Sequence, residues 1–361
     1  MVFYNPNIKK FKPYIAGKSI EELDRKSGIG ARNIVKLASN ENPLGSSPKA
    51  LAAIRRELDK VNRYPDSGYF SLRQKLSSKL KININNIVFG NGSDELIDCI
   101  IKSFSSLGDE VLSAKKTFLE YEIIAKVNGR EFKEVELKDY KYDLEKIPSS
   151  ITKKTRLIFI ANPNNPTGTY VNNREVESFL KKIPKNIIVV FDEAYNEFID
   201  VNDFPKTLNL FKKYNIIVLR TFSKTFGLAG LRIGFGVAKD ELINIMNKVR
   251  QPFNVNSLAA AAAIAAVDDV SFLKKTRELI WKEKKYLYNN LERLRIKFIP
   301  SVANFILIDV GESCDNVFKQ LLKKGVIVRP MTSYGLNNFV RVTIGTHNEN
   351  VRFIKALEEI V

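Results

Sequence analysis

Between about residues 85 and 250, short apolar runs rich in β-branched residues alternate with segments of helical period. The runs are NIVFGN, EVLSA, EFKEVEL, TRLIFIAN, NIIVVFDEA, NIIVLRTFS and LRIGFGVA, and helix-period stretches such as Glu95–Phe104 and Arg174–Lys182 lie between several of them. Strands buried on both faces have near-continuous apolar sequences, and strands that alternate with helices are typical of parallel sheets. The pattern therefore predicts an α/β fold on a large, mostly parallel sheet that helices cover on both faces.

The last hundred residues have a different pattern. A helical stretch from about Leu258 to Leu294 is followed by NFILIDV, a helix, VIVRP, FVRVTIG and a last helix, which predicts a second, smaller α/β unit. The first residues predict an irregular arm that packs on this smaller unit or on another subunit. We therefore expect an N-terminal arm over residues 1–35, a large domain over 36–250 and a small C-terminal domain over 251–361.

The chain is strongly basic. It has 58 Lys and Arg residues against 40 Asp and Glu, a formal net charge of +18. These basic residues are scattered along amphipathic segments and do not form a stripe with interleaved aromatics, so the sequence does not favour a nucleic-acid partner. A positive field would instead speed the encounter with phosphorylated or carboxylate substrates.

The sequence contains no membrane or secretory signal. No apolar run approaches the roughly 18 to 20 residues of a membrane-spanning helix, and the opening MVFYNPNIKKFKPY lacks the apolar core of a signal peptide. The two cysteines, Cys99 and Cys314, lie in apolar helix-like contexts with no CxxC pattern and no metal-like cluster around them. We expect a cytoplasmic protein with no membrane partner and no bound metal.

Polar residues follow several of the predicted strands. GNGSDE, ANPNNPTG, DEAY and TFSKT each come directly after an apolar run. Ligands of open α/β sheets bind at the carboxyl ends of the strands, where loops meet helix starts. These four segments therefore predict a binding site at one edge of the sheet.

Lys224 lies in TFSKTFGLAGLRIG, at the end of an apolar strand. Desolvation lowers the pKa of an amine, which makes it a nucleophile at neutral pH that can form a Schiff base. Arg232, eight residues further on, can bind a phosphate together with Ser223. The alternative is a solvated lysine after a strand, in a chain where lysine is abundant.

Asp192 ends the apolar run of VVFDEAYNEF, so we expect its side chain to be partly buried. A buried carboxylate usually needs a cationic partner. The pyridinium nitrogen of a cofactor would serve, and the carboxylate would keep that nitrogen protonated, so that the ring acts as an electron sink. Tyr195 can then bond the phenolic oxygen of the cofactor. A carboxylate that caps a loop or pairs with a structural arginine remains the alternative.

Two further segments, GNGSDE and NPNNPTG, are candidate parts of the binding site because of their position in the sequence. GNGSDE places Ser93 and Asp94 at a helix start, where free backbone N–H groups form an anion site, although a generic helix cap fits equally well. NPNNPTG, which contains Asn165, has the composition of a turn. Asp192 and Lys224 then follow, about one strand–helix–strand excursion apart. This order predicts that all four segments face one pocket.

Taken together, these segments carry a family resemblance over nearly the whole chain, from about Tyr14 onwards. The sequence resembles the class I/II aminotransferases of the aspartate-aminotransferase fold, which is fold type I of the pyridoxal-phosphate enzymes. Within them it is most similar to the histidinol-phosphate aminotransferases, because QPFNVNSLA and PYIAGKSIEE favour that branch. The segments that fit are KLASNENPLG, RYPD, GNGSDELI, NPNNPTG, DEAYNEF, TFSKTFGLAGLRIG, QPFNVNSLA, ANFIL and VRVTIGT.

The resemblance implies pyridoxal 5'-phosphate as the cofactor. Lys224 would hold it covalently and move a proton, and Asp192 would pair with the pyridine nitrogen. The ring oxygen would be bonded by Tyr195 and Asn165. The cofactor phosphate would be held by Ser93, Asp94, Ser223 and Arg232, joined by Tyr64 of the partner subunit.

Two positions depart from the family pattern in the segment KKTFLEY. Phe118 would stack on the cofactor ring where many relatives have tyrosine, so a hydroxyl contact is missing and Tyr121 takes a larger part. Lys116 replaces a proline that usually precedes the Thr of this segment.

The resemblance also implies the reaction: transamination of L-histidinol phosphate with 2-oxoglutarate, giving imidazole-acetol phosphate and glutamate in histidine biosynthesis, by a homodimer with shared active sites. Arg341 matches the arginine that binds substrate anions, and Tyr14 matches a residue near the substrate phosphate. Asn42 and Arg329 complete the expected substrate contacts.

Two rival functions remain, and the sequence argues against a third. An aromatic-amino-acid aminotransferase and a threonine-phosphate decarboxylase both keep the cofactor residues, so the motifs barely separate them from the first interpretation. A ligand-sensing module of a transcriptional regulator would need a DNA-binding segment before the fold. The roughly 35 residues that precede KLASNENP are too few for a helix-turn-helix.

Overall fold

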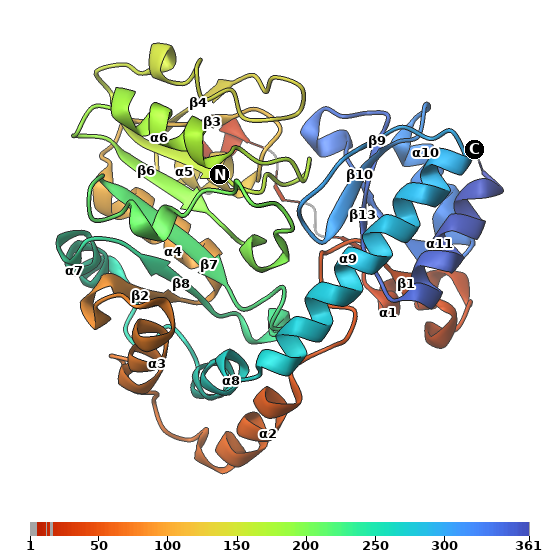
Figure 1. Cartoon of the computed structure of the whole chain (residues 1–361), viewed down its shortest axis with the longest axis horizontal. Helices are drawn as coiled ribbons and strands as arrows, with labels where there is room; N and C mark the ends of the chain where they lie inside the picture. The colour runs from red at the N-terminus through yellow and green to blue at the C-terminus, as the bar shows by residue number, and fades with distance from the viewer. Residues whose placement is uncertain (1–5, 12, 15–16, 361) are drawn as a thin grey trace, which may run out of the picture.

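The computed structural model describes residues 6–11, 13–14 and 17–360. In Figure 1 the chain forms a larger unit and a smaller unit, and the long helix α9 (Val270–Arg293) runs between them. Part of the predicted arm, residues 1–5, 12 and 15–16, lies outside the described residues.

The larger unit is built on a seven-stranded sheet in the order β2-β8-β7-β6-β5-β3-β4. Each strand lies within one of the apolar runs that predict it. The strands are β2 (Ile87–Gly90), β3 (Glu110–Ala114), β4 (Glu131–Val135), β5 (Thr155–Ala161), β6 (Ile188–Asp192), β7 (Ile216–Thr221) and β8 (Gly234–Val237).

Five adjacent strands, β4, β3, β5, β6 and β7, are mutually parallel, and β8 runs antiparallel between β7 and β2. The prediction of a mostly parallel sheet is therefore confirmed. Its centre is fully buried, as Ile158, Val190 and Leu219 show. Burial of each such side chain contributes about 1.5 to 3 kcal/mol, which explains why these strands have continuous apolar sequences.

Seven helices belong to the larger unit's packing. They are α2 (Pro48–Glu57), α3 (Phe70–Leu80), α4 (Gly92–Phe104), α5 (Glu120–Val127), α6 (Asn173–Lys182), α7 (Asp240–Val249) and α8 (Ser257–Val267). Helix α6 begins with a capping box, in which Asn172 and Glu175 satisfy each other's backbone N–H groups. Helix α8 is rich in alanine, and its small side chains let it pack closely on α2 and α3. The predicted domain boundary at residue 250 lies before α8, although α8 packs on helices of the larger unit.

The smaller unit holds a four-stranded antiparallel sheet in the order β12-β13-β10-β9 and a parallel pair of β1 with β11. Its helices are α9, α10 (Cys314–Lys323) and α11 (His347–Glu358). The strands are β1 (Val35–Lys36), β9 (Phe298–Ile299), β10 (Phe305–Asp309), β11 (Val326–Ile327), β12 (Arg329–Pro330) and β13 (Phe339–Thr343).

The long helical stretch expected from Leu258 to Leu294 is in fact two helices, so that prediction was wrong. Helix α8 ends at Val267 and α9 begins at Val270. The break occurs because the Asp269 carboxylate caps α9 by accepting from the backbone N–H of Phe272 at 3.4 Å, and also accepts from the Ser47 hydroxyl at 2.6 Å.

The predicted arm is not wholly irregular. It contains helix α1 (Ile20–Ser27), whose first turn is capped by Ser19, and the helix ends at Gly28 with a φ of 67°. Leu23 of α1 packs in a small core with Ile327 of β11, so this part of the arm lies on the smaller unit. The capping residue Ser19 followed by Glu22 is the sequence signal that would have predicted the helix.

Short 3₁₀ turns complete the described chain: η1 (Pro6–Lys10), η2 (Ala31–Asn33), η3 (Leu58–Lys60), η4 (Ile84–Asn86), η5 (Pro148–Ser150), η6 (Asn196–Phe198), η7 (Thr207–Asn209), η8 (Ala229–Leu231) and η9 (Thr332–Tyr334). Among the described helices, none has both the length and the apolar character that crossing a bilayer requires. In the same residues, no three His, Cys, Asp or Glu side chains form a metal-binding group.

Candidate active site

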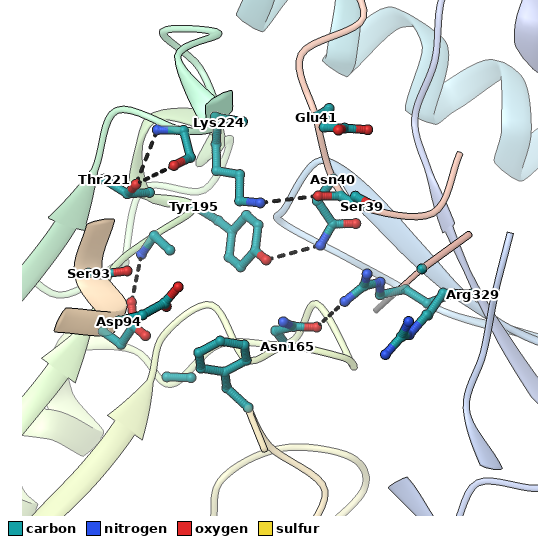
Figure 2. A pocket seen from close by; sticks show the side chains of 18 of the residues that line it. Ser39, Asn40, Glu41, Ser93, Asp94, Asn165, Tyr195, Thr221, Lys224 and Arg329 are labelled. Carbon is teal, nitrogen blue, oxygen red and sulfur yellow. Dashed lines mark hydrogen bonds between the residues drawn. The ribbon is translucent and has the colours of Figure 1, made fainter. Parts of the chain in front are cut away.

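A cavity of about 270 Å³ lies where β5, β6 and β7 end. Ala161 pairs with Asp192 across β5 and β6, and Asp192 pairs with Leu219 across β6 and β7. The segments that follow these strands therefore leave the sheet side by side. The smaller unit and the arm close the other side of the cavity with Tyr14, Arg329 and Arg341. Figure 2 shows the side chains of both units pointing toward one space.

Lys224 lines this cavity, and its amine donates a hydrogen bond to the backbone oxygen of Ser39 at 3.2 Å. Burial, with a further effect from the positive charge of Arg341, lowers the pKa of Lys224 to about 8. A substantial fraction of a buried amine with this pKa is neutral near physiological pH, so it can act as a nucleophile and a base.

Asp192 is only 6% exposed at the floor of the cavity. The Tyr121 hydroxyl donates to Oδ2 at 2.7 Å and the backbone N–H of Ala194 to Oδ1 at 3.2 Å. Burial raises the pKa of Asp192 to about 6. In the described part of the chain, no basic side chain forms an ion pair with Asp192. The neighbouring carboxylate, Glu193, does have such a partner, because it pairs with Arg220 at 2.8 Å.

The residues of the expected phosphate site meet where α4 begins. A Cβ atom on Gly92 would lie 2.5 Å from Nη2 of Arg232, and one on Gly234 would lie 2.7 Å from the backbone nitrogen of Ser93. Glycine at both positions therefore lets Arg232 and β8 approach the free N–H groups of the helix start. The Asp94 carboxylate pairs with Arg232 at 3.0 Å, so a phosphate contact from Asp94 would come from its backbone N–H.

Ser223 completes this cradle, because its hydroxyl and backbone N–H are both held by Thr221. The Thr221 hydroxyl donates to Ser223 Oγ at 2.9 Å and accepts from the Ser223 N–H at 3.1 Å. Thr221 lines the cavity and was not among the predicted residues. Its position two residues before Ser223 at the end of β7 is the only signal that would have found it.

Tyr195 and Asn165 lie at the middle of the cavity. The Tyr195 hydroxyl accepts a hydrogen bond from the side-chain amide of Asn40 at 3.0 Å, which leaves its own proton free to donate. Asn165 accepts a hydrogen bond at Oδ1 from Nη1 of Arg341, so its amide N–H groups remain for another acceptor. Asn40 is a residue that sequence reasoning missed, although it lies in the quoted segment KLASNENPLG.

Two buried arginines reach the cavity from adjacent strands of the smaller unit. Arg329 of β12 and Arg341 of β13 are direct partners in the antiparallel register, and each is only 7% exposed. Arg341 also donates to the backbone oxygen of Ala38 at 2.7 Å, while its Nε is buried and has no hydrogen-bond partner among the described residues. The Tyr14 ring lies 5.3 Å from the Arg329 guanidinium carbon, which brings the arm to the site.

The remaining predicted residues lie in different places. Phe118 lines the cavity with its ring edge-on to Tyr121, the centroids 5.6 Å apart. Asn42 does not line it: its amide donates to Thr225 and Thr276 below the site. Tyr64 lies outside the cavity of its own chain, because it is 82% exposed and stacks on Phe253.

Comparison with known proteins identifies the family. A model described as Aminotransferase class I and II matches residues 32–357. The chain belongs to this aminotransferase family. The histidinol-phosphate aminotransferase of Moorella thermoacetica is 44% identical over 356 residues, which span 98% of this chain and 92% of that relative. The one from Caldicellulosiruptor saccharolyticus is 43% identical, over 98% of this chain and 99% of the relative.

Solved structures agree with this family. Histidinol-phosphate aminotransferase from Sinorhizobium meliloti in complex with pyridoxal-5'-phosphate aligns with a TM-score of 0.90 and 28% identity, over 99% of this chain and 96% of that chain. Aspartate aminotransferase from Thermus thermophilus with maleate gives a TM-score of 0.86 at 20% identity over 100% of both chains, a likeness of fold alone. The protein is an aminotransferase of the aspartate-aminotransferase fold, and its cofactor is pyridoxal phosphate.

The cavity of this aminotransferase fits that cofactor. The cradle of Ser223, Arg232 and the start of α4 suits a phosphate dianion. Asp192 is a buried carboxylate without a cationic partner among the described residues, which suits a pyridinium nitrogen. The Tyr195 hydroxyl and the Asn165 amide both offer donors, which suits a phenolic oxygen.

The lowered pKa of Lys224 can be measured on the cofactor-free protein. We expect its labelling by trace acetic anhydride to reach half of its maximum near pH 8. A lysine peptide added as an internal standard should reach it near about pH 10.4. Peptide mass spectrometry over about pH 6 to 11 measures both. Restoring the cofactor should abolish labelling at this position alone. If the labelling of Lys224 and of the standard peptide reached half of their maximum at the same pH, burial would not lower the pKa of Lys224.

Proposed function

We propose that this aminotransferase exchanges the amino group of L-histidinol phosphate with 2-oxoglutarate, giving imidazole-acetol phosphate and glutamate, as a cytoplasmic enzyme of histidine biosynthesis. The names of its relatives support this substrate. The observation that carries the proposal is a pair of buried arginines in the cavity. Arg329 lies across it from Lys224 (Figure 2), and Arg341 is the direct partner of Arg329 on the adjacent strand.

The substrates explain why two buried arginines are needed. Histidinol phosphate has no α-carboxylate but carries a phosphate, and glutamate carries two carboxylates. A guanidinium binds either anion through two parallel hydrogen bonds, which the ammonium of lysine cannot do. Arg341 would offer the anion N–H groups that Asn165 and Ala38 do not occupy, and Arg329 beside it would supply the second positive charge needed for a dianion.

Several residues would hold the cofactor. We propose that Ser93, Ser223 and Arg232 bind its phosphate, with the backbone N–H of Asp94, and that Asp192 binds its pyridine nitrogen. Tyr195 and Asn165 would donate to its ring oxygen, and Phe118 would pack on the ring. When bound, pyridoxal phosphate supplies an electron sink for the bond broken at the substrate carbon.

Lys224 would act as the base of the reaction. Its amine is neutral in a substantial fraction of molecules because burial lowers its pKa to about 8, so Nζ can accept the proton that leaves the substrate Cα. Tyr14 and Arg329 at the mouth of the cavity would orient the substrate phosphate and restrict water. The roles of Tyr14 and Arg329 therefore concern binding, and that of Lys224 concerns proton transfer.

The function is tested by half-reaction kinetics. The holoenzyme is mixed separately with histidinol phosphate, phenylalanine and threonine phosphate, and the change in cofactor absorbance is followed. We expect the largest second-order rate constant with histidinol phosphate, because that donor alone combines a phosphate with an imidazole of matching size. A faster reaction with phenylalanine would favour an aromatic-amino-acid aminotransferase, and carbon dioxide release from threonine phosphate would favour the decarboxylase.

Arg341→Ala should weaken both half-reactions. Loss of a charge-assisted bidentate contact should cost on the order of 2 to 4 kcal/mol of transition-state binding with histidinol phosphate and with glutamate. Rate constants for the two donors, measured in parallel, give the comparison, and Arg293→Ala, an exposed arginine paired with Glu358, is the matched control. A loss confined to glutamate would assign the phosphate to Arg329 and Tyr14 instead.

We also propose that the enzyme is a C2 homodimer in which Tyr64 of the partner subunit reaches the cofactor phosphate. Tyr64 does not reach the cavity of its own chain. It stacks on Phe253, and both rings belong to a set of large apolar side chains of residues 51–70 and 253 that are exposed to solvent. Exposed apolar residues that lie together are typical of a protein interface. These residues are Leu51, Leu58, Val61, Tyr64, Phe70 and Phe253.

A mixing experiment tests the shared site. Lys224→Ala and Tyr64→Ala homodimers should each be severely impaired. Co-refolding them should restore about a quarter of the wild-type activity, because half of the dimers are mixed and each mixed dimer has one native composite site. If Tyr64 serves Lys224 of its own chain, every site keeps one defect and activity stays low. A monomer by analytical ultracentrifugation would also contradict the proposal.

A further inference from the structure

Tyr121 lies in the first turn of α5 and is completely buried at the floor of the cavity. Its ring stacks on Phe159 with centroids 4.8 Å apart, and Phe118 packs edge-on against it at 5.6 Å. Its hydroxyl lies 2.7 Å from Oδ2 of Asp192. Packing of the ring by two neighbours therefore fixes the direction in which the hydroxyl donates.

The Asp192 carboxylate receives one donor on each oxygen. Tyr121 bonds Oδ2, and the backbone N–H of Ala194 bonds Oδ1 at 3.2 Å. Two donors on opposite oxygens hold the plane of a carboxylate. Within the described residues, Tyr121 is the only side chain that donates a hydrogen bond to Asp192.

The other groups that face Asp192 disfavour its charge. Asp94 on α4 and Glu193, the next residue along the chain, are both acidic and raise its pKa, in addition to the larger effect of burial. The Tyr121 hydrogen bond acts in the opposite direction and lowers this pKa. A phenol that donates to a carboxylate stabilises its ionised form, and the low dielectric of a buried site strengthens the effect.

We propose that Tyr121 is a positioning residue of the transamination: its hydroxyl orients the Asp192 carboxylate and keeps it ionised, so that it can pair with the pyridinium nitrogen of the cofactor. The inference rests on the role proposed above for Asp192. It assigns to Tyr121 a task that is separate from the ring-oxygen contacts of Tyr195 and Asn165. The phenylalanine at position 118 leaves Tyr121 as the phenol on this side of the cofactor cavity.

Tyr142 provides a matched control. It is another buried tyrosine close to the end of β5, but its hydroxyl accepts from the backbone N–H of Ala161 at 3.2 Å and donates to Thr117 at 2.8 Å. Thr117 in turn donates to Asn164 at 2.8 Å. This hydroxyl therefore supports the turn after β5, and its hydrogen bonds within the described chain do not include Asp192.

The test measures the cofactor dissociation constant of Tyr121→Phe and Tyr142→Phe as a function of pH, from about pH 5 to 9, by visible absorbance. At pH 7 the affinity of Tyr121→Phe should fall by about tenfold to a hundredfold, because a hydrogen bond to a charged group is lost. Removing this donor raises the pKa of Asp192, so the pH below which affinity declines should move upward. Tyr142→Phe should leave that pH unchanged. An unchanged pH in Tyr121→Phe would overturn the inference.

The variant Asp192→Asn tests the proposed role of Asp192 separately from that of Tyr121. It should weaken cofactor binding more than Tyr121→Phe does, and the double variant should bind no more weakly than Asp192→Asn alone, because both changes act through one carboxylate. If Asp192→Asn binds the cofactor like the wild type, the proposed role of Asp192 is wrong. If Asp192→Asn is impaired but Tyr121→Phe is not, only the role of Tyr121 is wrong.

A second variant keeps the inference testable if Tyr121→Phe does not fold. Tyr121→3-fluorotyrosine, introduced at this position alone, preserves the shape of the ring and makes the phenol a stronger donor. The pH below which cofactor affinity declines should then move downward, opposite to the change in Tyr121→Phe. A shift in the same direction, or none, would contradict the proposed hydrogen bond.

Discussion

The parallel register of β5, β6 and β7 is the constraint on which the site depends. Ala161, Asp192 and Leu219 lie in one row across the three strands, so the turn that holds Asn165, the Asp192 carboxylate and the segment before Lys224 all emerge at the same edge. The antiparallel strand β8 continues the sheet, and two residues beyond this row its Gly234 pairs with both Thr221 and Gly90. Backbone hydrogen bonds of the sheet thus bring the start of α4, which follows Gly90, to the same edge as Asp192 and Lys224.

Burial then shifts two ionisable groups in opposite directions. It raises the pKa of Asp192 to about 6 and lowers that of Lys224 to about 8, since a charged carboxylate and a charged amine both lose their hydration. Removing such groups from water destabilises the folded protein unless partners compensate for it. The Tyr121 hydroxyl and the backbone oxygen of Ser39 compensate in part. The compensation is incomplete, so a cofactor with a cationic nitrogen would stabilise the buried Asp192 carboxylate. An electrophilic carbon of the same cofactor would react with the neutral amine of Lys224.

The sequence predicted those features of the fold that depend on residues close together along the chain. The apolar runs gave the seven strands of the larger sheet, because burial on both faces requires continuous apolar sequence. The break between α8 and α9 was missed although its cap is local, because Asp269 accepts from the backbone N–H of Phe272 three residues further on. Asn40 was missed for a different reason. Its amide bonds Tyr195 and its backbone N–H bonds Thr343, so its place in the site follows from tertiary contacts and not from local pattern.

The hydrogen bond from Arg341 to Asn165 connects the two halves of the site. Arg341 comes from β13 of the smaller unit, and Asn165 comes from the turn after β5 of the larger one. A guanidinium has five N–H groups in a fixed plane. With one directed to Asn165 and another to Ala38, the plane of the guanidinium is set before any substrate arrives. The same contact uses the amide oxygen of Asn165 and leaves its N–H groups for another acceptor. If Asn165 binds the cofactor and Arg341 the substrate as proposed, a displacement of Arg341 would disturb both contacts.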